Sequence, residues 1–322
     1  MLDIKRILCP TDVSTNSDQA LRYALALTRA YESELTLCYR PEDGEISGAA
    51  VIKEGPVAAS PAQEKGKEIF ERALLKFLAP EALVGLNWQG LLMEGEDVGE
   101  AITRTASKYS ADLIVMRSRR RPHRAALLGS TAESVCRTAP CPVLVTHTDE
   151  RDWVQPLTRS ISLQRVLVPC DFSDDSELAL KHALSFAQEY QAELHLLHVL
   201  PPHTRNEPEI AWPPNQRESA YHNAARRLER AVPSETHLWC EIKHAVSEGH
   251  PYREVLNYAE RNAIDLISIG AHGADFGMRA LFGSNVDRVL RQAPCPVLVA
   301  RRLKPSSFQT TVEPVAKFTA AI

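Results

Sequence analysis

The 322-residue sequence lacks the features that mark several large classes of protein. No stretch approaches the roughly 18 consecutive apolar residues that a membrane-spanning helix needs, and the first ten residues, MLDIKRILCP, do not have the layout of a signal peptide. The formal net charge is −4, so no overall basic field points to nucleic acid. We therefore expect a cytoplasmic globular protein whose partners are neither membranes nor nucleic acids.

Patterns that hold metals or disulfides are also missing. The seven cysteines form no C-x-x-C pair. Four of them lie in or beside apolar runs, as reduced core residues do: Cys9, Cys141, Cys170 and Cys295. His195 and His198 are three residues apart in an expected strand, so they should face opposite sides of it and cannot chelate one ion together. The sequence also has no Walker A motif, no G-x-G-x-x-G and no G-x-S-x-G.

Glycine is scarce, and its distribution is uneven. The chain has 14 glycines in 322 residues, below the usual ~7%. Four fall in one short stretch between an expected strand (264–269) and an expected helix: Gly270, Gly273, Gly277 and Gly283. Such a loop presents backbone N–H groups to an anion, and Ser284 can cap the helix or donate to a phosphate oxygen. For any single glycine, a tight turn after the strand is the alternative role.

The sequence is a tandem duplication. RILCPTDVS at 6–14 returns as RVLVPCDFS at 165–173, and APCPVLV at 139–145 returns unchanged at 293–299. Within each copy, strands and helices alternate. This alternation predicts an α/β fold of two tandem Rossmann-like domains, each a five-stranded parallel sheet with helices on both faces.

Composition suggests where the domains begin and end. We expect a first domain, a polar linker, a second domain and a C-terminal tail, at residues 1–146, 147–163, 164–301 and 302–322. The irregular segments 41–61 and 201–216 are expected to be surface loops that lead into helices at 63–78 and 218–231.

The glycine-rich stretch resembles a known signature. Gly270-x2-Gly273-x9-Gly283-Ser284, followed by the APCPVLV strand, is similar to the ATP-binding motif of the universal stress proteins. The resemblance implies a stress-response protein that binds ATP, with Mg²⁺ as a candidate companion ion, in its second domain. The residues that it implies contact the nucleotide are Pro169, Cys170, Asp171, Val199, Gly270, Gly273, Gly283, Ser284 and Asn285. For Asp171, which would face the adenosine, a helix cap is an alternative role, and one residue can serve both.

The resemblance also implies how the two copies associate. Tandem members of the family pair their copies through the last strands, here 142–146 and 296–300, which gives a pseudo-twofold monomer that could form a further homodimer. The two apolar strands would otherwise be exposed sheet edges.

The first copy departs from the glycine pattern. Arg117 and Arg120 stand where the second copy has Gly270 and Gly273. A side chain at these positions would occupy the space where a phosphate approaches the backbone, so we expect this copy to have lost ordinary ATP binding. The surrounding cationic cluster could bind another anion or an acidic partner, although we favour a solvated surface loop: Arg117, Arg119, Arg120, Arg121, His123 and Arg124.

No residue pattern indicates catalysis. Phosphoryl transfer needs a metal ligand and a base or water-orienting group. In the second copy only Asp171 and His272 are candidates, and we interpret His272 as an exposed loop histidine. The leading hypothesis is a non-catalytic regulatory protein. Two alternatives stay open, a slow ATPase or nucleotidyl-transfer enzyme on the same fold, and an interaction scaffold that binds no nucleotide.

Overall fold

The computed structural model describes ten stretches of the chain: 3–12, 18–40, 74, 82–93, 97–118, 130–147, 150–155, 160–202, 214–272 and 283–301. Several segments discussed above lie outside them: the loop 41–61, the expected helix 63–78 except Leu74, the arginine-rich residues 119–124, Gly273, Gly277 and the tail 302–322.

Both halves of the chain alternate strands and helices. The strands of the first half are β1 (Arg6–Thr11), β2 (Glu34–Tyr39), β3 (Asn87–Leu92), β4 (Leu113–Arg117) and β5 (Val143–Thr146). Its described helices are α1 (Asp18–Ala30), α3 (Val98–Lys108) and α4 (Ser130–Thr138). The strands of the second half are β6 (Arg165–Pro169), β7 (Glu193–Leu200), β8 (Ile242–Glu248), β9 (Leu266–Gly270) and β10 (Val297–Ala300). Its helices are α5 (Asp174–Tyr190), α6 (Pro214–Ala231), the 3-10 helix η2 (Ser234–Leu238), α7 (Pro251–Arg261) and α8 (Ser284–Gln292).

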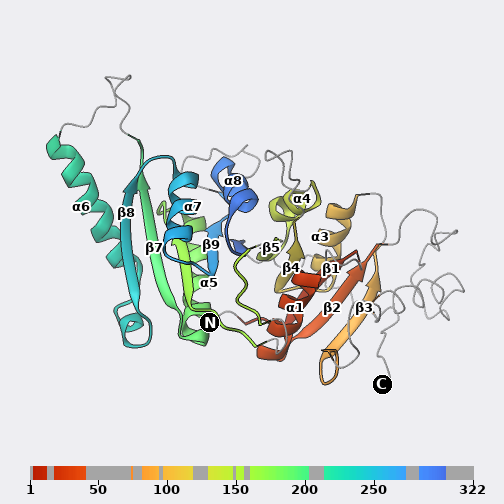
Figure 1. Cartoon of the computed structure of the whole chain (residues 1–322). Helices are drawn as coiled ribbons and strands as arrows, with labels where there is room; N and C mark the ends of the chain where they lie inside the picture. The colour runs from red at the N-terminus through yellow and green to blue at the C-terminus, as the bar shows by residue number, and fades with distance from the viewer. Residues whose placement is uncertain are drawn as a thin grey trace, which may run out of the picture.

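All ten strands belong to one sheet. Their order is β3-β2-β1-β4-β5-β10-β9-β6-β7-β8, which Figure 1 shows as a continuous surface from one side of the molecule to the other. Neighbouring strands run parallel except β5 and β10, which pair antiparallel. The predicted fold class, two Rossmann-like domains with five parallel strands each, is confirmed.

The pairing of β5 with β10 relates the two halves by a pseudo-twofold axis. Leu144 pairs with Leu298, and these two residues occupy the same position in the repeated APCPVLV sequence. Val143 and Val145 pair with the valines on either side of Leu298. Because each strand meets its own repeat in reverse, the axis passes between the two leucines. The last strands of the two copies, both buried, are thus neighbours at the centre of the sheet.

Side-chain alternation along the strands assigns a different set of helices to each face. His195 of β7 lies 3.0 Å from the hydroxyl of Tyr258 on α7, whereas the ring of His198 packs 4.6 Å from that of Phe172, just before α5. The two histidines face opposite sides, as predicted. One buried core lies between the sheet and α1, α5 and α6, and the other lies under α3, α4, α7 and α8. Each core includes residues of both halves.

The linker between the domains is part of the packed structure. Trp153 is 1% exposed, and its ring meets that of Tyr23 on α1 edge-on at 4.6 Å. The backbone N–H of Trp153 donates to the Tyr23 hydroxyl at 3.1 Å, while that of Arg151 donates to the carbonyl of Pro294 at 2.7 Å. The linker therefore fastens a helix of the first half to the turn before β10 in the second.

Helix α6 begins at Pro214, four residues earlier than the sequence predicted. Proline fits the first turn of a helix because its fixed φ is helical and its missing N–H has no intrahelical partner there. The prolines before residue 216 therefore did not extend the loop as far as we expected. No helix in the described stretches is both long and apolar enough to cross a membrane.

Candidate functional site

The predicted site residues gather at the edge of the sheet where β6, β7 and β9 end and α8 begins. In β6, Leu167 belongs to the core under α7 and α8, while Cys170 belongs to the opposite core. Asp171 comes two residues after the end of β6 and is exposed at this edge. Val199 at the end of β7 packs against the core under α7 and α8. Val199 therefore lies on the same side of the sheet as the start of α8, and Asp171 lies at the same edge.

Within the described stretches, the first backbone N–H groups of α8 have no hydrogen-bond acceptor. Gly283 is the N-cap residue, and no side chain caps the helix, although serine or aspartate would cap it better. The first N–H groups of a helix have no intrahelical partner, and Ser284 and Asn285 in this turn are exposed. The φ of Gly283 is −59°, and a Cβ placed there would come no closer than 3.4 Å to Val286. Neither the backbone conformation nor the packing of the described chain requires glycine here, so its effect is to leave the approach to these donors open.

Gly270 has a different reason to be glycine. A Cβ at this position would lie 2.6 Å from the carbonyl carbon of Asp175 and 2.8 Å from its oxygen, at the start of α5. The missing side chain lets α5 pack directly against the end of β9. This packing is a reason for glycine in addition to the phosphate contact that the sequence predicted, which stays a prediction. The equivalent residue in the first half is Arg117, which carries a side chain at this position.

Asp171 organises the entry to α5. Its Oδ1 accepts from the backbone N–H of Ser173 at 3.0 Å and from the Ser173 hydroxyl at 2.6 Å. Ser173 is the actual N-cap, because its Oγ accepts from the N–H of Ser176. Asp171 therefore supports the cap rather than forming it. Its carboxylate remains exposed at the strand end, where a ribose hydroxyl could donate to it.

Phe172, the residue after Asp171, and Arg227 of α6 form the wall of the site on the α5 and α6 side. Phe172 has a φ of 64°, a rare value for a bulky residue. Its ring lies between the guanidinium of Arg227 on α6, 3.8 Å from the ring centre, and the ring of His198. The Nδ1–H of His198 donates to the carbonyl of Cys170 at 2.6 Å.

Cys170 has a packing role in the structure, and its predicted nucleotide contact stays a prediction. Its backbone N–H donates to the carbonyl of Leu197 at 2.8 Å, and its carbonyl accepts from His198. The thiol is buried in the core under α5, and burial raises its pKa to about 12. Pro169, at the end of β6, is half-buried beside it. Cys170 thus offers no ionised or exposed group to a ligand.

His272 is held by an aspartate that sequence reasoning missed. The Oδ2 of Asp175 accepts from the backbone N–H of His272 at 3.0 Å and from its ring Nδ1 at 2.9 Å. The side chain of His272 is 37% exposed, which agrees with an exposed loop histidine, and its two hydrogen bonds to Asp175 orient the ring. Nothing in the sequence separates Asp175 from other acids of a first helical turn, because its partner lies 97 residues away. Among the described residues, no group of three or more His, Cys, Asp or Glu side chains could hold a metal ion.

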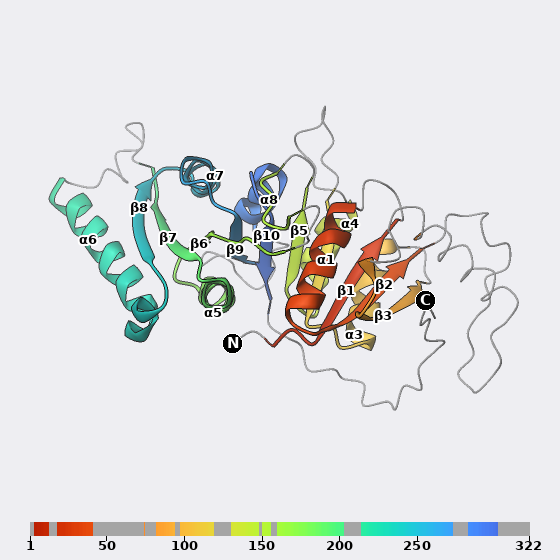
Figure 2. The same ribbon diagram turned by 60° about the horizontal axis from the view of Figure 1, so that its bottom comes forward.

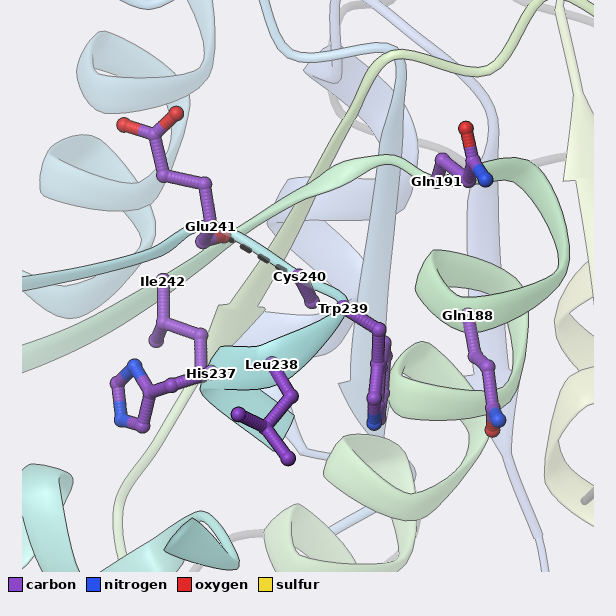
Figure 3. Close-up of a pocket in the computed structure, with 8 residues that line it drawn as sticks. All are labelled: Gln188, Gln191, His237, Leu238, Trp239, Cys240, Glu241 and Ile242. Atoms are coloured by element: carbon purple, nitrogen blue, oxygen red, sulfur yellow. Dashed lines mark hydrogen bonds between the residues drawn. The ribbon is translucent and has the colours of Figure 1, made fainter. Parts of the chain in front are cut away.

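A pocket of about 760 Å³ lies at the opposite edge of the same domain. Figure 3 shows its lining, which comes from the end of α5 and from η2 and the residues after it. Leu238 is 87% exposed at its rim. β7 and β8 begin here, whereas the candidate site is where parallel strands end. The pocket is therefore separate from the residues that the sequence predicted.

Comparison with known proteins identifies relatives over nearly the whole chain. The model of the Universal stress protein family matches twice, at residues 3–147 and 162–301. A universal stress protein from Mycolicibacterium smegmatis is 29% identical over 308 residues, which cover 92% of this chain and 96% of the relative. One from Methanocaldococcus jannaschii is 31% identical over 143 residues, 44% of this chain and 84% of the relative.

A solved structure has the same fold over a similar length. The crystal structure of a universal stress protein from Archaeoglobus fulgidus covers 92% of this chain and 96% of its own, with a TM-score of 0.61 and 22% identity. Identity at this level supports the shared fold alone.

Proposed function

Because the chain belongs to the universal stress protein family, we propose that its second half binds ATP and that its first half does not. The start of α8 carries this proposal. Gly283 leaves an uncapped helix N-terminus open without being required by φ or by packing, and such a terminus favours a phosphate through its N–H groups and its dipole.

The adenosine end of the ligand would lie over Asp171 and Val199. Asp171 presents an exposed carboxylate that can accept from ribose hydroxyls, and Val199 offers apolar contact to the base. Both lie at the sheet edge where β6, β7 and β9 end and α8 begins, so one extended nucleotide could contact them and the start of α8 together. The wall formed by Phe172 and Arg227 would limit the site on the other side.

We propose that binding is regulatory rather than catalytic. One contact favours hydrolysis as a second candidate function, because Asp175 orients the His272 imidazole next to the phosphate loop, and a base oriented by a carboxylate is a recurring catalytic arrangement. Phosphate release over many turnovers distinguishes the two functions.

Nucleotide content tests the binding proposal directly. The purified protein is denatured and the released nucleotides are identified by mass spectrometry, with ATP affinity measured by calorimetry after any bound nucleotide has been removed. We expect about one ATP per chain. Two per chain would contradict the assignment of the first half as vacant, and no ATP, bound or added back, would refute the proposal.

Gly283→Ala is the informative variant, with Gly129→Ala at the same position of the first copy as its matched control. The added methyl group at Gly283 meets nothing closer than 3.4 Å in the chain, so the protein should fold. It would, however, stand in the path of a phosphate. We expect the variant to lose ATP affinity by about tenfold or more, the scale of one lost charge-assisted contact, and the control to keep it. Equal affinity in both variants would refute a phosphate site at α8.

A further inference from the structure

The N-terminal halves of α7 and α8 bring two arginines together on one aromatic ring. Arg253 and Arg288, which we call the arginine pair, have their guanidinium carbons 5.7 Å and 4.5 Å from the ring centre of Tyr252. The Nε–H of Arg253 also donates to the Tyr252 hydroxyl at 2.8 Å. The two helices are neighbours in both views (Figures 1 and 2) and contact each other along the same face of the sheet.

No carboxylate in the described stretches forms an ion pair with either arginine. The acids next to them in sequence have other partners: Glu254 accepts from the hydroxyl of Ser247, and Asp287 accepts from Arg291. Two positive charges that share one ring repel each other, and an anion between them removes that repulsion. Within the described part of the chain, the positive charge of the arginine pair is therefore not balanced by a carboxylate.

Tyr252 lies in the positive electrostatic potential of the arginine pair. The pKa of Tyr252 lies below its ordinary value because Arg253 donates to the phenol oxygen and because both guanidinium charges favour the phenolate. The same field favours any other anionic oxygen brought to this place.

The arginine pair is continuous with the candidate phosphate site. Ser284 and Arg288 are four residues apart, so they share one side of α8. Helix α7 begins at the same edge, but Pro251 has no N–H group and the N–H groups of Arg253 and Glu254 donate to the carbonyl of His250. The contribution of α7 to this surface therefore comes from its arginine side chain. A phosphate chain whose inner groups lie at the start of α8 would extend toward the arginine pair.

The first half of the chain provides an internal comparison. The positions equivalent to Tyr252, Arg253 and Arg288 are Val98, Gly99 and Ser134, none of which is charged. The helices also pack closer there, because a Cβ on Gly99 would lie 2.7 Å from the Cβ of Ser134. The charged cluster therefore occurs in the half with the intact glycine signature and is missing from the half where arginines replace the glycines.

We propose that the arginine pair binds the terminal phosphate of the nucleotide, so that the site prefers ATP to AMP. This inference rests on the proposed function and adds to it a basis for selecting the length of the phosphate chain. Guanidinium groups suit this role because they donate two parallel hydrogen bonds to phosphate oxygens and stay charged at any physiological pH. Stacking on Tyr252 holds them in place before the ligand arrives.

Arg253→Gln and Arg288→Gln test the inference, with Arg261→Gln as the matched control. Arg261 is exposed in the last turn of the same helix, α7, so the control removes the same charge at the far end. Calorimetry at fixed salt gives the affinity of each protein for ATP and AMP. We expect each site variant to bind ATP about tenfold more weakly, the scale of one lost charged hydrogen bond. Its AMP affinity should stay within about twofold, and the control should be unchanged.

Each alternative outcome is decisive. If ATP and AMP weaken equally, the arginine pair does not contact the terminal phosphate. If both affinities stay at wild-type values, the inference is wrong while the proposed function stands. If the wild-type protein binds no ATP, both are wrong. Circular dichroism melts of the three variants show that any loss arises in the site and not from unfolding.

Discussion

Replacing Gly270 with alanine should destabilise the protein far more than the same change at Gly283. The Cβ at position 270 would lie 2.6, 2.8 and 2.9 Å from three atoms of Asp175, two of them backbone atoms. Backbone cannot move aside as the end of a side chain can, so the first turn of α5 must shift away from β9. At position 283 the nearest atom is 3.4 Å away, which is an ordinary contact.

The magnitude follows from the contacts that must change. Overpacking typically costs about 1–3 kcal/mol. A shift of α5 also weakens the two hydrogen bonds between Asp175 and His272, each contributing about 1 kcal/mol at a half-exposed site. Alanine also has less conformational freedom than glycine in the unfolded chain, which offsets roughly 0.5 kcal/mol of this loss in stability. We expect a net loss of about 2–4 kcal/mol for Gly270→Ala, against under about 1 kcal/mol for Gly283→Ala, where only N-cap preference changes.

Urea unfolding, followed by circular dichroism, measures both free energies of unfolding. The slope against urea should stay constant between the variants, so that a change of midpoint reports stability alone. If Gly270→Ala is as stable as the wild type, α5 does not pack against β9 as described. In that case the phosphate role that sequence reasoning gave to Gly270 becomes the better account.

Two further predictions concern histidines. His182 on α5 is buried, which lowers its pKa to about 4, so it folds neutral and takes up a proton on unfolding below its ordinary pKa of 6.5. The free energy of unfolding should not depend on this residue above pH 6.5 and should fall by about 2–3 kcal/mol between pH 6.5 and 4. Urea unfolding at a series of pH values should show a shallower fall for His182→Gln than for the wild type. Identical pH profiles of the two proteins would contradict the prediction. For His272, we expect no sustained phosphate release from ATP in the wild type, as measured by a coupled assay over many turnovers. Release that His272→Gln abolishes without loss of ATP binding would favour the hydrolytic function instead.

The architecture could be predicted from the sequence because the chain contains two copies of one module. The repeat at 6–14 and 165–173 and the repeated APCPVLV segment defined two equivalent modules. The alternation of strand and helix within each module leaves little choice but a parallel sheet with crossover helices. The limits of elements were less predictable, as the early start of α6 at Pro214 shows, because proline breaks a helix in its interior but not in its first turn.

The site was predictable only in part. The chain positions of Asp171, Val199, Gly283 and Ser284 could be assigned to one edge, since parallel strands end together. The direction in which each side chain points could not be predicted from the sequence. Cys170 precedes Asp171 by one position, yet its thiol is buried in the core under α5, whereas Asp171 is exposed.

The sequence by itself determined the duplication, the fold class and the edge of the sheet on which a ligand would lie, because periodicity and motif spacing are local properties of the chain. Tertiary structure alone decided which groups meet at that edge. Asp175 reaches His272 across 97 residues, and Arg253 and Arg288 meet on Tyr252 from two different helices. Such contacts depend on how closely helices pack on the sheet. At Gly270 that distance is set by the absence of a single Cβ atom.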